Sequence, residues 1–326
     1  MGQLIKLQDY ISRYEQDIFS YPSRFVRLKQ QQWTRTKENW ETEGVDASNL
    51  SFQNQGFEQS DEKEKQPFFA KMKDLLKFNT RVEDVWEVEA ETKALEMDDD
   101  SLQFSAAFHV KPAEINDLKQ QFLDQLFRFQ LKWASTTLFE KSNLHSKFYF
   151  DDKLKFFLQR FPDTFLTLYR PIFLLKKAPV EAEIILLTPT DAWCISFLEE
   201  ENDSVFIGSS ERFWLKRLKN DESKFLNPVI ALNRTEKIVR KIFQLHEIDL
   251  PIHKLILSRN GYIDFPSPPF DVKFVEMRNF DGWFQSMRSL KSPLKHIQLK
   301  AAQVLLQYCQ TASMRRHEWE KPEQDN

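Results

Sequence analysis

The strongest pattern along the chain is a pair of short apolar runs separated by a polar turn. Residues 184–187 form the first run, residues 188–191 the turn, and residues 192–198 the second run. Each run is shorter than an average helix and rich in Ile, Leu, Trp and Cys, which is typical of a buried strand. The pattern therefore predicts a β-hairpin at the centre of a mixed sheet.

Apolar residues at helical spacing predict helices on both sides of this hairpin. The clearest of these helices starts at Pro112 and continues for about five turns. Near the N-terminus, a second stripe predicts a helix that is followed by another helix opening at Pro22; the stripe consists of Leu4, Leu7, Ile11, Tyr14 and Ile18. Later helices are expected after Asp151, after Asn227-Pro228 and after Ser292-Pro293, where capping residues or proline precede apolar stripes.

These elements divide the chain into three expected parts. Residues 1–145 are a helical region that contains a polar linker at 42–66 and an acidic segment at 83–100. Residues 146–250 are expected to form an α/β domain, and residues 251–326 an extension of strands and then helices packed on that domain. The predicted fold is thus an α/β mixed sheet flanked by helices, with an α-helical N-terminal region and a C-terminal helical extension.

Composition narrows the classes of function. The 46 basic and 49 acidic residues give a net charge of −3, so only a local basic surface can favour nucleic acid. The two cysteines, Cys194 and Cys309, lack the spacing of a disulfide framework or a zinc site, and Cys194 lies in the apolar hairpin as a small core residue. No apolar run reaches the ~18 residues of a membrane span, and we expect a cytoplasmic protein without a membrane partner. The six glycines form no phosphate-binding loop motif, which disfavours nucleotide-binding enzymes of that kind.

Three stretches of sequence carry a family resemblance. They are FYFDDKLKFFLQRFP at 148–162, VEAEIILLTPTDAWCISFLE at 180–199, and ERFW at 211–214 followed by LNPVIALNRTEKIVRKI at 226–242. The order of helix, strands, hairpin, short strand, Trp, Asn-Pro and helix resembles the nuclease-related domain (NERD) family. The resemblance covers about a third of the chain and implies a restriction-endonuclease-like core.

The resemblance also implies where a catalytic metal would sit. Such nucleases hold Mg²⁺ with an acid on each strand of the hairpin, and a Lys two residues after the second acid assists the attacking water. The first acidic position falls on Glu183 and an acid on the preceding helix on Asp151. The second acidic position falls on Ser196 and the Lys position on Leu198. The resemblance therefore implies a catalytically silent domain without a cofactor.

Two other interpretations stay open at the level of sequence. Glu200 shares strand parity with Ser196, so Glu183, Glu200 and Asp151 could form a displaced Mg²⁺ site of an active nuclease. A second group of this kind is Asp271, Lys273 and Glu276. The remaining interpretation is a structural protein whose Phe-rich helices form a homo-oligomer.

A zinc hydrolase is not among these alternatives. His246 and His253 lack the spacing of the two-His helical motif of zinc hydrolases.

A silent domain would act by binding. The helix after Asn227-Pro228 carries an outward basic set, which we expect to contact nucleic acid: Arg234, Lys237, Arg240 and Lys241. Four phosphate contacts would give a log–log salt slope of about −3 to −4. The alternative partner is a protein bound through the helical region.

Overall fold

The computed structural model describes residues 1–50, 112–175, 178–200, 202–219 and 221–315. The chain divides into two compact units, Met1–Lys29 with Pro112–Asn326, and Gln30–Lys111. The acidic segment at 83–100 and most of the expected linker lie outside the described residues. All the strands of the described residues belong to the first unit.

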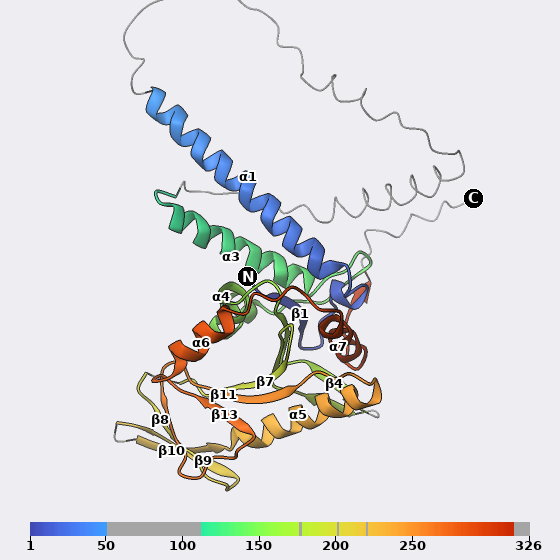
Figure 1. Ribbon diagram of the computed structural model, residues 1–326, viewed down its shortest axis with the longest axis vertical. Coiled ribbons are helices and arrows are strands. Elements are labelled where there is room, and N and C mark those ends of the chain that lie inside the picture. Colours follow the sequence, from blue (N-terminus) through green and yellow to red (C-terminus); the bar gives the residue numbers. More distant parts are fainter. Residues whose placement is uncertain (51–111, 176–177, 201, 220, 316–326) are drawn as a thin grey trace, which may run out of the picture. The chain divides into compact units, whose positions relative to one another are not determined.

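A mixed six-stranded sheet forms the centre of the first unit (Figure 1). Its order is β1 (Gln3–Leu7), β3 (Leu166–Tyr169), β6 (Ile184–Leu187), β7 (Ala192–Phe197), β11 (Ile252–Leu257) and β13 (Val272–Val275). The strands β3, β6 and β7 form an antiparallel meander, whereas β11 runs parallel to β7 and β13 parallel to β11. The β6–β7 pairing confirms the predicted central hairpin. The sheet takes strands from all three parts into which the sequence pattern divided the chain.

The expected helix at the N-terminus is wrong. Residues 3–7 form strand β1, which pairs in parallel with β3 at the edge of the sheet, and a short 3-10 helix, η1 (Arg13–Glu15), follows. The stripe did mark buried positions, because all five of its apolar residues are buried. It could not reveal that polar neighbours are buried too: Gln3 donates to the carbonyls of Pro22 and Asp163, and Lys6 donates to Glu15 and Thr311.

Helices cover both faces of the sheet. On one side lie α4 (Asp152–Arg160) and α6 (Phe280–Arg288), with α3 (Ile115–Trp133) packed on α4 and β1 (Figure 1). A cluster of phenylalanines fills this side, including Phe156, Phe157, Phe161 and Phe165. Because each buried Phe contributes about 1.5–3 kcal/mol, these rings are a main source of stability. On the other side, α5 (Pro228–Leu245) packs on β7 and β11 and contacts α7 (His296–Gln307).

Helix starts follow the capping signals at α4 and α5, whereas α3 begins at Ile115, three residues after Pro112. Asp151 caps α4, and the Asn227 side chain accepts from the Val229 amide at the start of α5, with Pro228 in the first turn. The last helix, in contrast, begins at His296, beyond Ser292-Pro293. In addition, α1 (Tyr21–Leu50) continues through residues 42–50, which the sequence pattern had assigned to the linker.

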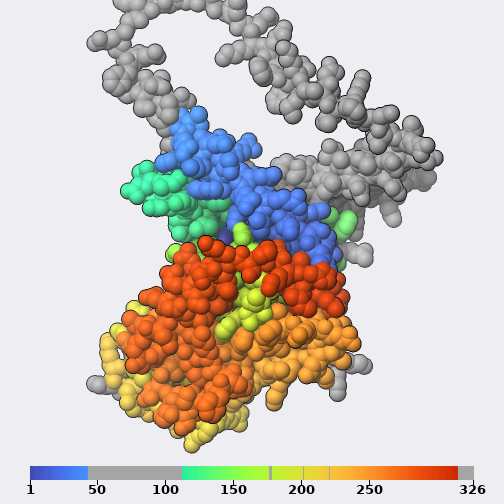
Figure 2. Space-filling model, viewed as in Figure 1, coloured from blue at the N-terminus to red at the C-terminus, as the bar shows by residue number. Residues whose placement is uncertain are grey.

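Smaller sheets complete the unit. A four-stranded sheet has the order β10 (Asp221–Leu226), β9 (Phe213–Leu218), β8 (Val205–Ile207) and β12 (Tyr262–Asp264). Two-stranded sheets are formed by β4 (Ile172–Leu175) with β5 (Ala178–Glu181) and by β2 (Glu140–Lys141) with β14 (Met314–Arg315), and η3 (Ser146–Phe150) precedes α4. The C-terminal segment, orange to red, forms most of the visible face of this unit in Figure 2. None of the helices among the described residues combines the length and the apolar character of a membrane span.

Candidate functional site

Two of the positions that the resemblance assigned to a metal site, Glu183 and Ser196, meet where β6 begins. The register pairs Ile184 with Ile195, so Glu183 comes next to Ser196 on the neighbouring strand. Ser196 thus lies opposite Glu183, where its hydroxyl acts to lower the pKa of the Glu183 carboxyl, and the Glu183 amide donates to the Thr235 hydroxyl of α5 at 2.9 Å. Ile184 and Ile195 belong to the phenylalanine cluster on the other side of the sheet, so strand alternation places Glu183 and Ser196 on the α5 face.

The environment of Glu183 favours its neutral form. Burial raises the pKa of Glu183, while Arg170, Ser196 and Arg234 act in the opposite direction. Among the described residues, no group of three or more His, Cys, Asp or Glu side chains could hold a metal ion. A half-buried carboxyl outside such a group offers too few oxygen ligands for Mg²⁺.

Asp151 is fully engaged in local structure. One carboxylate oxygen accepts from the amides of Lys153 and Leu154, both at 3.0 Å, and so caps α4. The other oxygen accepts from the Tyr169 hydroxyl at 2.7 Å, at the end of β3. These three hydrogen bonds give Asp151 a structural task that its place before a helix had only partly indicated.

Glu200 and Leu198 have different surroundings. Glu200 is 54% exposed and lies 3.3 Å from the Lys216 amine on β9, in the four-stranded sheet. Leu198 is only 7% exposed. The structure thus brings Glu183 and Ser196 together but, among the described residues, does not gather Glu183, Glu200 and Asp151 into one cluster of metal ligands.

Arg259 and Glu199 form a bidentate ion pair just after β11 and β7, which the sequence pattern did not indicate. Arg259, after β11, donates to both carboxylate oxygens of Glu199, and its guanidinium stacks on the rings of Phe156 and Phe197 at 4.7 and 5.6 Å. Only the pairing of β7 with β11 brings these residues together. Because its charge is paired and covered by rings, Arg259 is not available as the missing cationic partner.

The other candidate groups are dispersed. Asp271 pairs with Lys254, Lys273 lies over the Trp193 ring, and Glu276 accepts from the Ile263 amide and from Arg278. His246 contacts the Tyr308 hydroxyl at 3.2 Å, and His253 contacts Asp191 at 2.9 Å. Each residue therefore has a local partner and none adds to the Glu183 position.

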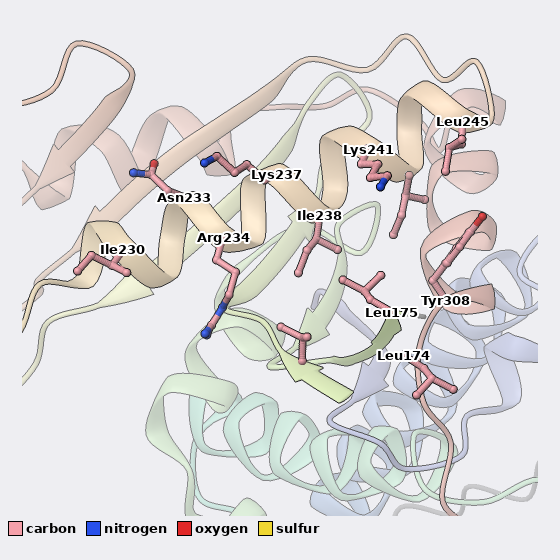
Figure 3. A pocket seen from close by; sticks show the side chains of 12 residues that line it. Leu174, Leu175, Ile230, Asn233, Arg234, Lys237, Ile238, Lys241, Leu245 and Tyr308 are labelled. Atoms are coloured by element: carbon pink, nitrogen blue, oxygen red, sulfur yellow. The ribbon is translucent and has the colours of Figure 1, made fainter. Parts of the chain in front are cut away.

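Three of the four basic residues on α5 line one groove (Figure 3). The groove has a volume of about 860 Å³ and is lined by Leu174, Leu175, Val180, Ile230, Asn233, Arg234, Lys237, Ile238, Lys241, Ile242, Leu245 and Tyr308. Arg240 is not part of this lining, and its guanidinium pairs with Glu236 on the same helix. The basic set is thus split, with Arg240 apart from the groove.

The groove combines exposed cations with aliphatic walls. Arg234 extends from α5 toward the β4–β5 hairpin, where it donates to the Glu181 carbonyl at 3.1 Å, and Ile238 points toward Leu175 (Figure 3). Lys237 and Lys241 are exposed and have no ion-pair partner among the described residues. The helical stripe of α5 indicated the outward cations, but the opposing wall from β4, β5 and Tyr308 had no local signal.

Comparison with known proteins gives one short match. Over 43 residues the chain is 60% identical to a protein of Geobacillus stearothermophilus named RNA 2',3'-cyclic phosphodiesterase. The match covers 13% of this chain and spans only 14% of the length of the relative. No protein-family model and no solved structure matches the chain. The match is too short to show a family or to transfer an activity.

Proposed function

We propose that this protein is a divergent nuclease-related domain that has lost metal-dependent cleavage and acts by binding an anionic ligand. The described elements support this proposal, because they follow the order on which the resemblance rests. From α4 the chain runs through β3, β4, the β6–β7 hairpin and the short strand β8 to Trp214 on β9, and then through Asn227-Pro228 into α5, with β5 and β10 as additional strands in this order. A mixed sheet with helices on both faces is also what a restriction-endonuclease-like core requires.

The hydroxyl of Ser196, at the position opposite Glu183, carries the proposed loss of catalysis. A metal-dependent nuclease uses its ion to lower the pKa of water and to offset charge on the phosphate. In this chain the second acidic position is a hydroxyl and the Lys position is a buried Leu198. The neutral form of Glu183 is favoured by burial, which further weakens it as a ligand.

The groove on α5 supports the proposed binding role. Its cations, Arg234, Lys237 and Lys241, favour an anion, and both nucleic acid and an acidic protein segment satisfy that requirement. Nucleic acid predicts a steep salt dependence, and with three contacts instead of four the expected log–log slope is about −2 to −3.

A cleavage assay tests the loss of catalysis. Plasmid DNA and RNA, including an RNA ending in a 2',3'-cyclic phosphate, are incubated with the purified chain in Mg²⁺ or Mn²⁺, beside a Glu183→Ala variant. We expect no metal-dependent hydrolysis in either sample. Hydrolysis by the native chain that disappears in Glu183→Ala would restore the nuclease interpretation. Light scattering of the same sample distinguishes a homo-oligomer from a monomeric binding protein.

A further inference from the structure

The groove between α5 and the β4–β5 hairpin has mainly aliphatic walls. Seven of its lining residues are aliphatic and one, Tyr308, is aromatic. Three of the aliphatic side chains are strongly exposed: Ile230 at 45%, Leu174 at 50% and Leu245 at 62%. Exposed apolar residues that gather at one groove, rather than being scattered, are typical of a binding surface. The ligand must therefore cover aliphatic surface.

The charges of the groove come from one helix face. Arg234, Lys237 and Lys241 follow one another at intervals of three and four residues, so their side chains lie in a row along α5. Arg234 is held toward the hairpin by the Glu181 carbonyl, whereas the two lysines have no ion-pair partner among the described residues. The ligand must bring a negative charge to an aliphatic surface.

The dimensions suit an elongated small molecule. A volume of about 860 Å³ lies within the roughly 300–1,000 Å³ of small-molecule sites. From Ile230 to Leu245 the helix rises by about 22 Å at 1.5 Å per residue. The groove is therefore long enough for an extended acyl chain.

We infer that this groove binds a long-chain fatty acid, with the carboxylate at one of the cations in the row Arg234, Lys237 and Lys241 and the acyl chain along the aliphatic walls. The inference rests on the proposed function as a binding protein and names its ligand. Nucleic acid fits these walls less well, because unpaired bases stack on aromatic side chains and the groove supplies one. A duplex would contact the cations and leave the aliphatic walls uncovered.

Fluorescence titration of the full chain with cis-parinaric acid tests the inference. We expect the probe to brighten on binding and oleate to displace it, whereas oleyl alcohol, which lacks the charge, displaces it at least about tenfold less well. Among saturated fatty acids, each added methylene strengthens binding by up to about fourfold while it is still buried. Equal competition by oleate and oleyl alcohol would overturn the role of the cations.

Matched variants locate the site. The combined change Arg234→Ala, Lys237→Ala and Lys241→Ala is expected to weaken oleate binding about tenfold or more, and Arg240→Ala is its control because Arg240 lies outside the groove. Leu174→Ser tests the apolar wall, and Leu226→Ser is its control. Both leucines are 50% exposed, but only Leu174 lines the groove. Equal losses in test and control variants would overturn this location.

The remaining outcomes separate this inference from the proposed function. If RNA or DNA binds with an affinity that falls as salt rises, and oleate does not bind, the inference is overturned and the binding role is left intact. Binding to phosphatidylglycerol vesicles without binding of monomeric oleate would replace the inference with a membrane-surface site, and binding of an acidic peptide alone with a protein partner. Metal-dependent cleavage of nucleic acid, in contrast, would overturn the proposed function itself.

Discussion

Replacing Asp151 by alanine is expected to destabilise the first unit by about 2–4 kcal/mol. The first contribution is the lost cap of α4, because the amides of Lys153 and Leu154 lose their acceptor, and such a loss costs about 1 kcal/mol. The second comes from Tyr169, which is 3% exposed and would keep a hydroxyl without an acceptor at a cost of about 1–3 kcal/mol.

Asp151→Asn is the matched control. Asparagine caps helices about as well as aspartate, but its NH2 group can only donate to the Tyr169 oxygen and leaves the Tyr169 O–H without its acceptor, so we expect a cost of about 1–2 kcal/mol, smaller than that of Asp151→Ala. Tyr169→Phe completes a double-mutant cycle with Asp151→Ala. The two changes share one hydrogen bond, so the double variant is expected to lose less than the sum of the single losses, by at least about 0.5 kcal/mol.

Urea unfolding measures these differences. The chain contains 8 tryptophans, so fluorescence can be followed beside far-ultraviolet circular dichroism. Free energies are compared at equal m-values, since a change in m would indicate a different denatured state. A loss below about 0.5 kcal/mol in Asp151→Ala would refute the structural role. If Asp151→Ala is as stable as the native chain but loses a Mn²⁺-dependent cleavage that the native chain performs, the Asp151 carboxylate is catalytic rather than structural.

Two further predictions concern buried charge. Burial raises the pKa of Glu183 above its ordinary value of 4.5, so the stabilisation from its bound proton is complete below that value and is lost as pH rises through the raised pKa. Glu183→Gln is therefore expected to be more stable than the native chain at pH 7 and equal to it below about pH 4, and a urea-midpoint difference that does not change with pH would contradict this. Lys6→Met should cost about 1–3 kcal/mol in urea unfolding because it leaves the Glu15 carboxylate, 22% exposed, without its cation. Adding Glu15→Gln should recover part of this loss, and no recovery would show that the Lys6 stem, rather than its charge, matters.

Local sequence was sufficient where an element depends on its own residues. The β6–β7 hairpin follows from two apolar runs around a turn, and α4 and α5 follow from a capping residue before an apolar stripe. At the N-terminus the same reasoning failed, because residues 3–7 satisfy their backbone hydrogen bonds with β3, whose residues 166–169 lie far along the chain. A strand needs a partner, and the pattern of one segment does not contain it.

The candidate sites show the same division. The sequence by itself determined that Ser196 and Leu198 cannot serve as a carboxylate and a cation, since this depends only on residue type. Only the tertiary structure decided that Ser196 lies opposite Glu183 and that Arg259 pairs with Glu199. It alone set Arg234, Lys237 and Lys241 against an aliphatic wall from β4 and β5, with Arg240 turned away. The physical reason is that a periodic pattern reports which side of an element is buried, whereas pairing between charges, hydroxyls and apolar walls depends on elements that meet only when the chain folds.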